Sequence, residues 1–266
     1  MTEILSLLSA TLGVSVALFL GLWLMSLKIG EPSFVDAFWA FGMVVVAITA
    51  YFAVDGLHER QLLLTALCVI WGLRLGFHLL TRWRREGPDN RYARMMKSVK
   101  EKRGWSYARA SLLFVFLPQA FLMWMVALPV QLGQVADAPP LGWLAAMGAG
   151  LAVFGIVFES LADAQLERFK DDPANEGKVM DKGLWAWTRH PNYFGDACTW
   201  WGIWLVAAET APGLLAVIGP IFLTFTLTRW SGAPLLEAGM ARSRAGYAEY
   251  VERTSGFIPW PPKRRG

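Results

Sequence analysis

The chain has little of what a metal centre, a disulfide framework or a soluble cofactor module requires. It contains only two cysteines, Cys68 and Cys198, and three histidines, His58, His78 and His190. The cysteines lie far apart in apolar segments and the histidines are scattered, so their spacing suits neither disulfides nor a catalytic metal. The chain also lacks the phosphate-binding patterns G-x-G-x-x-G after a strand and G-x-x-x-x-G-K-[ST]. The sequence therefore predicts no metal and no Rossmann or P-loop module.

Charge is also scarce, because only 17% of the residues are charged whereas 55% are hydrophobic and the mean hydropathy is +0.37. A chain of this composition is typical of a membrane protein. A helix that crosses a bilayer needs about 20 mostly apolar residues. Segments of this kind, of which the sixth is short, lie near 4–27, 34–54, 61–81, 109–131, 141–163, 196–208 and 213–230. The sequence thus predicts an all-α bundle of seven transmembrane helices in a single domain, 1–266, whose first segment is retained rather than cleaved.

The basic residues indicate an orientation for this bundle. Nine Lys and Arg fall in 82–108, five in 164–195 and seven from Arg229 to the end, together 21 of 25. The connections 132–140 and 209–212 have none. With seven spans, all basic connections lie on one side. The positive-inside rule then places the amino terminus outside and the carboxyl terminus in the cytoplasm.

Several ionisable residues lie within or beside the expected spans. Asp36 is near the start of the second span, and Arg74 and His78 share one face of the third at i, i+4 spacing. Glu159 and Asp163 have the same spacing at the end of the fifth. Such groups cost several kcal/mol inside a bilayer unless they are paired or hydrated. Two interpretations stay open: Asp36 and Arg74 pair and lock two helices together, or they line a polar cavity for a charged ligand.

The densest polar string is GLWAWTRHPNYFGD at 183–196. Arg189 and His190 offer donors that suit phosphate oxygens, and a proline then opens the next helix. Asn192 and Tyr193 add hydrogen-bonding groups and a stacking ring. The string is typical of an anion site at a helix start. The alternative is a basic interfacial turn that touches lipid phosphates.

Basic and aromatic residues also alternate in the tail, 242–260. Tyr247 and Tyr250 lie on adjacent turns of one expected helix, where their phenols suit stacking and hydrogen bonding to a ligand. The final basic run, 263–265, suits contact with anionic lipid.

The strings LWAWTRHPNYFGD from Leu184 and YAEYVERTSGFIPW from Tyr247 together resemble the steroid 5α-reductase superfamily, in particular a bacterial branch of it. The chain length and the seven-span layout agree with that group over nearly the whole sequence. The resemblance implies NADPH-dependent reduction of the carbon–carbon double bond of a 3-oxo-Δ4 steroid or a similar lipophilic enone. It also implies a monomer in a bacterial inner membrane, in contact with membrane lipid and not with nucleic acid, whose cofactor site faces the cytoplasm.

The resemblance places the cofactor site on the third span, the fifth span and the two strings. Glu159 stands where the eukaryotic reductases carry Asn, and His78 where they carry Tyr. The expected NADPH-binding residues are Arg74, His78, Arg84, Arg85, Glu159, Asp163, Lys170, Lys178, Arg189, His190, Asn192, Tyr193, Tyr247 and Tyr250.

The expected catalytic residues are Glu31 and Asp36. In the eukaryotic reductases the carboxylate that holds the 3-oxo end of the steroid precedes a Pro-Ser-Phe run, as Glu31 does here, and Asp36 is a rival for that role. Trp71 stands where the tyrosine proton donor is expected, and an indole is not an acid. Glu31, Asp36, Tyr51 or a water must then supply the proton. The expected substrate-binding residues are Glu31, Phe38, Trp39 and Trp71, so that spans 4–131 form mainly the substrate side and 141–266 mainly the cofactor side.

Two other functions stay open. A membrane methyltransferase of the isoprenylcysteine carboxyl methyltransferase type shares an Arg-His-Pro-x-Tyr-x-Gly turn and a Tyr-rich tail. Its S-adenosylmethionine is a cation without phosphate, which needs carboxylates, so the basic excess favours NADPH. A non-enzymatic sterol or lipid binder would explain the apolar bundle, but not the Arg, Asn and Tyr gathered at one mouth.

Overall fold

The computed structural model describes residues 2–54, 59–135 and 139–263. These residues are largely helical in the expected spans, with breaks such as that at 216–217, and contain no strand, only one isolated bridge between Thr188 and Ser255. Six helical segments are long and apolar enough to cross a membrane: α1 (Thr2–Ile29), α2 (Val35–Ala53), α3 (Glu59–Glu86), Tyr107–Val126, α8 (Trp143–Asp171) and Ala211–Ser243. The prediction of an all-helical polytopic membrane protein is confirmed. The count of seven and the orientation stay predictions.

The helix at the predicted sixth span is short. It is α9 (Pro191–Ala207), which has 17 residues. At 1.5 Å per residue it rises about 25 Å, somewhat less than the hydrocarbon core of about 30 Å. Proline opens this helix because its missing N–H costs no intrahelical bond at the first position.

Two of the long segments are interrupted. Tyr107–Val126 comprises α5 (Tyr107–Ser111), a π-turn η1 (Leu112–Phe116) and α6 (Leu117–Val126), with α7 (Leu128–Leu132) beyond. Pro118 in the first turn of α6 has no N–H for the usual bond one turn back, which favours a widened turn there. The last segment comprises α10 (Ala211–Leu215), α11 (Ile218–Phe225), a second π-turn η4 (Thr226–Trp230) and α12 (Ala233–Ser243), and α13 (Tyr247–Arg253) follows.

The contacts divide the chain into two compact units. The first comprises 1–145 and 206–219, and the second 146–205 and 220–266. The predicted single domain thus contains two units, and 206–219, which was expected on the cofactor side, belongs to the first unit.

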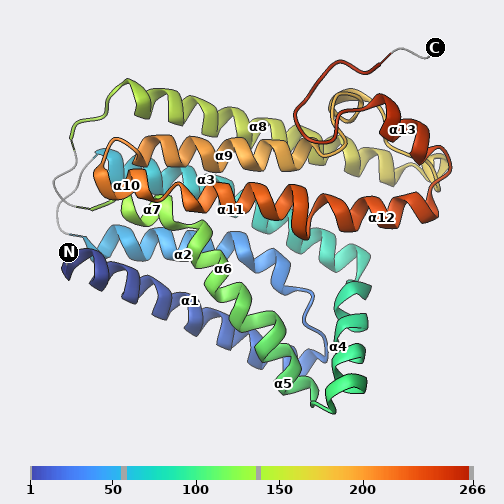
Figure 1. The fold of residues 1–266 in the computed structure, drawn as a ribbon, viewed down its shortest axis with the longest axis horizontal. Coiled ribbons are helices and arrows are strands. Elements are labelled where there is room, and N and C mark those ends of the chain that lie inside the picture. Colours follow the sequence, from blue (N-terminus) through green and yellow to red (C-terminus); the bar gives the residue numbers. More distant parts are fainter. Residues whose placement is uncertain (1, 55–58, 136–138, 264–266) are drawn as a thin grey trace. The chain divides into compact units, whose positions relative to one another are not determined.

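In the first unit α2 packs closely against α3. A Cβ at Gly72 would lie 2.8 Å from the carbonyl oxygen of Ala40, so only glycine lets the two helices approach this far. Val46, Leu64 and Met123 are fully buried between the helices. The short helix α4 (Asn90–Arg103) lies across the ends of the long helices of this unit (Figure 1).

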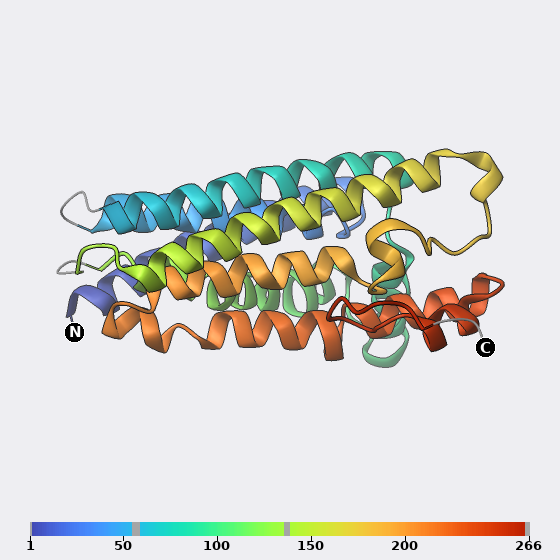
Figure 2. The ribbon, with the colours of Figure 1, turned by 90° about the horizontal axis from the view of Figure 1, so that it is seen from above.

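In the second unit α8 and α9 lie side by side (Figure 2). A Cβ at Gly195 would lie 2.6 Å from the backbone nitrogen of Glu159, which shows how close the two backbones are. On its other side α9 contacts α11, because Trp201 Nε1 donates a hydrogen bond to Thr224 Oγ1 at 3.1 Å. Two short 3₁₀ turns, Pro173–Asn175 and Gly183–Ala186, follow α8.

Candidate functional site

The carboxylate of Asp36, at the second position of α2, is held by α4. The hydroxyl of Tyr92 donates a hydrogen bond to Asp36 Oδ1 at 2.6 Å, and Arg91 Nη2 lies 3.7 Å from Oδ2. Both partners come from the first turn of α4, which begins where the Asp89 side chain accepts the backbone N–H of Arg91. The carboxylate at the start of this span thus pairs with an arginine and accepts a hydrogen bond from a phenol, both from the connection after α3.

A chain of hydrogen bonds leads from this carboxylate along the first unit. Gln119 Nε2 of α6 donates to the Tyr92 oxygen at 3.1 Å, and Trp39 Nε1 of α2 donates to Gln119 Oε1 at 2.6 Å. Burial, reinforced by the charge of Asp36, raises the pKa of Tyr92 well above its usual value. The phenol therefore stays protonated at neutral pH, and it is fixed from three helices.

Glu31 is also fully engaged, in the turn before α2. Its Oε2 accepts the backbone N–H of Ser33 at 2.7 Å and the Ser33 hydroxyl at 2.6 Å, and its Oε1 accepts Trp83 Nε1 at 3.1 Å. The Ser33 hydroxyl oxygen in turn accepts the backbone N–H of Asp89 at 3.0 Å. Glu31 thereby ties the turn to the end of α3 and to the start of α4.

Asp89 and Arg91 form the outer part of this network. Arg91 Nη2 lies 2.7 Å from Asp89 Oδ2. Burial alone would raise the pKa of Asp89, but the hydrogen bonds from Arg91 outweigh it and hold the pKa below its usual value. Asp89 is therefore ionised at neutral pH and keeps Arg91 directed at the start of α2.

The other residues predicted in the first unit lie on α2 and α3. Trp71 is buried, and Arg74 and His78 are half-buried and engaged with other groups. Both interpretations of Asp36 and Arg74 stay open. Phe38 packs edge-on against Phe34 at 5.9 Å between ring centres. Arg84 and Arg85 are exposed in the last turn of α3, and their cofactor role stays a prediction.

In the second unit the two predicted carboxylates, Glu159 and Asp163, lie where α8 meets α9, together with Asp196, which was not predicted as a site residue. Glu159, Asp163 and Asp196 are all buried, with exposed fractions of 3%, 5% and 8%. Asn192 Nδ2 in the first turn of α9 donates to Asp163 Oδ1 at 3.1 Å. The sequence placed Asn192 at the start of a helix, and the structure agrees.

Arg189 and His190 share one carboxylate that the sequence did not single out. Glu237 of α12 accepts Arg189 Nε at 2.8 Å and lies 2.9 Å from His190 Nε2. Burial lowers the pKa of His190, although Glu237 opposes the shift, so the imidazole is neutral at pH 7. Tyr193 stacks on the His190 ring at 5.4 Å between centres.

The two strings that carry the resemblance contact each other. Arg189 Nη1 donates to the carbonyl of Thr254 at 2.8 Å, and the Arg189 backbone N–H donates to the carbonyl of Ser255 at 2.9 Å. The Tyr250 hydroxyl donates to the carbonyl of Trp185 at 2.6 Å. Much of the hydrogen-bonding capacity that we predicted for a ligand thus holds the tail in place, while the cofactor role of these residues stays a prediction.

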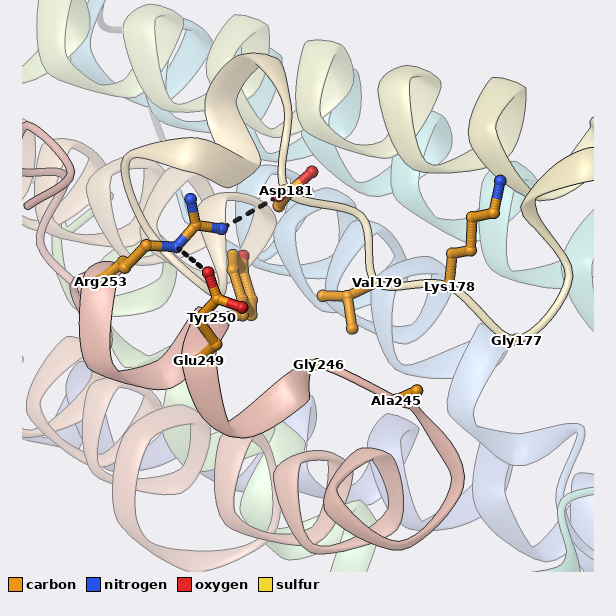
Figure 3. A pocket seen from close by; sticks show the side chains of 9 residues that line it. All are labelled: Gly177, Lys178, Val179, Asp181, Ala245, Gly246, Glu249, Tyr250 and Arg253. Atoms are coloured by element: carbon orange, nitrogen blue, oxygen red, sulfur yellow. Dashed lines mark hydrogen bonds and ion pairs between the residues drawn. The ribbon is translucent and has the colours of Figure 1, made fainter. Parts of the chain in front are cut away.

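Two hollows open beside this assembly. The first, about 250 Å³, lies between 177–181 and α13, and Figure 3 shows Lys178 at one end and Arg253 paired with Asp181 at 3.1 Å at the other. The second, about 230 Å³, is lined by Lys170 and Arg244 among others. Each hollow therefore carries two cations and two carboxylates, the carboxylates being Asp181 and Glu249 in the first and Asp172 and Glu176 in the second.

Tyrosines of α13 complete this region. Burial raises the pKa of Tyr247 to about 12, and it also raises that of Tyr250, which lines the first hollow. Both phenols are therefore neutral hydrogen-bonding groups at physiological pH.

The residues that sequence reasoning missed are Arg91, Tyr92, Gln119, Glu237, Arg244 and Arg253. Tyr92 follows the turn signal Gly87-Pro88-Asp89-Asn90, which marked a helix start, but nothing in the local sequence connects it with Asp36, 56 positions earlier. Glu237 carried a weak signal, because it is a carboxylate in an otherwise apolar segment.

Comparison with known proteins gives a family and one relative. A family model described as "Protein of unknown function (DUF1295)" matches residues 22–254. An uncharacterized protein of Schizosaccharomyces pombe is 23% identical over 283 aligned positions, which cover 93% of this chain and 78% of the relative. No solved structure matches the chain. The match of the family model includes the Asp36–Tyr92 pair and the Arg189–Glu237 pair.

Proposed function

The chain belongs to the DUF1295 family, and we propose that it is an NADPH-dependent reductase of the carbon–carbon double bond of a 3-oxo-Δ4 steroid or a similar lipophilic enone. The observation that carries the proposal is the hydrogen bond between Tyr92 and Asp36 at the end of an apolar helical unit. The resemblance of the two strings to the steroid 5α-reductase superfamily supports the same chemistry.

Reduction of an enone places negative charge on the ketone oxygen, and a donor aimed at that oxygen lowers the barrier. Tyr92 is such a donor, because its hydroxyl is protonated at neutral pH and is directed at the Asp36 oxygen from one fixed position. When a ketone oxygen takes the acceptor position of Asp36, the phenol donates to the ketone instead. Tyr92 thus fills the role for which Trp71 has no acidic proton.

The surrounding residues position the phenol. Gln119 donates to the Tyr92 oxygen, and Trp39 fixes the amide of Gln119, so the remaining hydroxyl proton has a defined direction. Positioning of this kind contributes through orientation rather than through new chemistry. Phe38, which is half-buried and packs against the buried Phe34, provides apolar surface two residues after Asp36, which suits a lipophilic substrate and excludes water.

NADPH, when bound, would supply a hydride for the β carbon of the enone, and water would supply the proton that the α carbon of the resulting enolate takes up to give the saturated ketone. The phosphates of NADPH need cations. Pockets for drug-sized ligands have volumes of about 300–1,000 Å³, so neither hollow is large enough by itself to hold the whole dinucleotide. Lys178 and Lys170 each line a separate hollow, and their ammonium groups suit different phosphate groups of one dinucleotide. Asn192, Tyr247 and Tyr250 would bind its neutral parts.

The basic residues concentrated in three connections support a cofactor region on the cytoplasmic side of a bacterial inner membrane, in an arrangement of seven spans with the amino terminus outside. Lipophilic substrate then enters from the bilayer, and the dinucleotide from the cytoplasm. The protein acts as a monomer.

Oxidation of NADPH by the purified protein tests the proposal. Testosterone or another Δ4-3-ketone should consume reduced nicotinamide absorbance and yield the saturated ketone by mass spectrometry. A saturated 3-ketosteroid is the matched control and should give no consumption. Absence of turnover with every Δ4-3-ketone and polyprenoid enone would contradict the proposal.

The buried carboxylates Glu159, Asp163 and Asp196 favour a second candidate, an S-adenosylmethionine-dependent methyltransferase. Negative charge where α8 meets α9 suits a sulfonium cation better than a phosphate. Thermal unfolding with each cofactor separates the two candidates. A rise in melting temperature with S-adenosylmethionine and none with NADPH would favour the methyltransferase.

A further inference from the structure

The helix α4 is tied closely to the ends of two membrane spans. Gly87–Asp89 connects it to α3, and Gly104–Ser106 connects it to α5. Three residues reach at most about 11 Å, so α4 cannot leave the level at which these spans end. Its orientation across the ends of the long helices of the first unit, visible in Figure 1, makes it a helix in the plane of the membrane surface.

The two faces of α4 differ in chemistry. Tyr92, Met95, Met96 and Val99 recur at helical spacing and are half-buried. The rest of the helix carries six cations and a single carboxylate, Glu101, and none of its residues is fully buried. Its outer face is therefore a strongly positive surface.

Most of this charge has no counterpart in the protein. Lys97 lies 3.9 Å from Glu101, an exposed pair that contributes little. Arg94, Lys100 and Lys102 have no ion-pair partner within the described residues. Exposed like charges on one helix repel each other, so an anionic partner would relieve the repulsion.

Trp105, next to the carboxyl end of α4, indicates the depth of this surface in the membrane. The guanidinium groups of Arg103 and Arg109 lie over the Trp105 ring, at 5.2 and 4.0 Å from its centre. Tryptophan concentrates at the level of lipid headgroups, and arginine beside it reaches the phosphates. The carboxyl end of α4 is thus placed where phospholipid phosphates lie.

We infer that the outer face of α4, formed by Arg94, Lys97, Lys100 and Lys102, binds the headgroups of anionic phospholipids of the surrounding leaflet. The same helix presents Tyr92 and Arg91 to Asp36, so bound lipid holds α4 in the position that forms this contact. The regulatory part of the inference, lipid control of the Tyr92–Asp36 pair, rests on the proposed reductase function. The binding part does not.

Hydrogen exchange of the full chain in nanodiscs tests both parts. Wild-type protein is compared in phosphatidylcholine alone, in phosphatidylcholine with phosphatidylglycerol, and in phosphatidylcholine with added inorganic phosphate. Exchange of the α4 amides should slow by about tenfold with phosphatidylglycerol only, because the basic side chains of the outer face are attracted to the anionic surface and hold the helix against it. At about 1 M salt, where the screening length is about 3 Å, this protection should disappear.

A charge-neutralised variant locates the effect. The triple substitution Arg94→Gln, Lys97→Gln and Lys100→Gln should remove the protection, whereas the control triple Arg168→Gln, Lys182→Gln and Arg242→Gln in the second unit should keep it. Equal loss in both variants would overturn the assignment to α4. Equal exchange with and without phosphatidylglycerol would overturn phospholipid binding by α4 in favour of an acidic protein partner. Protection by inorganic phosphate alone would overturn it in favour of a soluble anion.

Enone turnover in the two lipid mixtures tests the regulatory part separately. Turnover should rise with phosphatidylglycerol in wild type and in the control triple, but not in the α4 triple. Protection of α4 without turnover of any enone would refute the reductase and leave the lipid surface standing. Turnover that is equal in the two mixtures, with protection present, would overturn the regulatory part alone.

Discussion

Tyr92 and Asp36 form a hydrogen bond of 2.6 Å that joins the first turn of α4 to the first turn of α2. A carboxylate at the start of a membrane span thereby gains a proton donor from a polar connection. The phenol is held on its other side by Gln119, so its one proton has a single direction. The geometry makes Tyr92, and not Trp71, the residue whose loss tests the proposed chemistry.

We expect Tyr92→Phe to lower kcat with a Δ4-3-ketone by about 10²- to 10⁴-fold, the usual contribution of a positioned acid. Phenylalanine keeps the aromatic ring at position 92, so the fold and the affinity for NADPH should change little. Steady-state kinetics and NADPH-induced thermal stabilisation measure the two effects.

Tyr107→Phe is the matched control for this substitution. The Tyr107 hydroxyl lies in the same unit and donates only a long hydrogen bond of 3.4 Å to the carbonyl of Ser26. It should retain wild-type kcat. Equal kcat in Tyr92→Phe and wild type would remove Tyr92 from the catalytic role.

Alkaline pH should destabilise the protein through its buried phenols. Burial raises the pKa of Tyr247 to about 12, above the value of about 10 in an unfolded chain. Between these pH values the folded state holds a proton that the unfolded state has lost. The contribution of the protonated Tyr247 to the free energy of unfolding is therefore fully present below this window and is lost as pH rises through it.

Thermal unfolding between neutral pH and pH 11 measures this effect. The melting temperature of wild type should decline above about pH 10, and the decline should be shallower in Tyr247→Phe. An identical decline in the variant and wild type would show that Tyr247 does not contribute to it.

Much of the fold was predictable, because hydropathy depends on the local sequence alone. The expected span 34–54 is α2 (Val35–Ala53) to within a residue at each end. Partners of charged residues were not predictable. Asp36 was expected to pair with Arg74 or to line a cavity, and the structure adds partners, Tyr92 and Arg91, from a connection whose helix start was visible but whose position was not. Tertiary contacts across 56 residues leave no periodic signal.

Arg60 shows the same limit. Its side chain is only 1% exposed, and its Nη2 lies 2.7 Å from Glu209 Oε2. It also donates to the carbonyls of Val206 and Pro139. No local pattern indicates this contact, since Arg60 and Glu209 lie 149 positions apart.

We expect Glu209→Gln to destabilise the protein by about 3–5 kcal/mol, because it leaves the buried guanidinium of Arg60 without a counter-charge. Thermal or denaturant unfolding in detergent measures the loss. Glu101→Gln, which removes only an exposed carboxylate of α4, is the control and should stay within about 0.5 kcal/mol of wild type. A Glu209→Gln variant as stable as wild type would show that the carbonyl oxygens alone satisfy Arg60.

Arg189 donates hydrogen bonds to Glu237 and to carbonyl groups of the tail in this structure. Lysine keeps the charge but lacks the planar fork that contacts these groups together, so Arg189→Lys should loosen 247–260 and make it sensitive to limited proteolysis. Arg242→Lys, on an exposed position of α12, should leave proteolysis unchanged. If Arg189 instead mainly binds a cofactor phosphate, Arg189→Lys would weaken NADPH-induced stabilisation without loosening the tail. Cleavage mapping by mass spectrometry, with and without NADPH, separates these roles. Only loss of the Arg189 hydrogen bonds to Glu237 and the tail would change cleavage before any ligand is added.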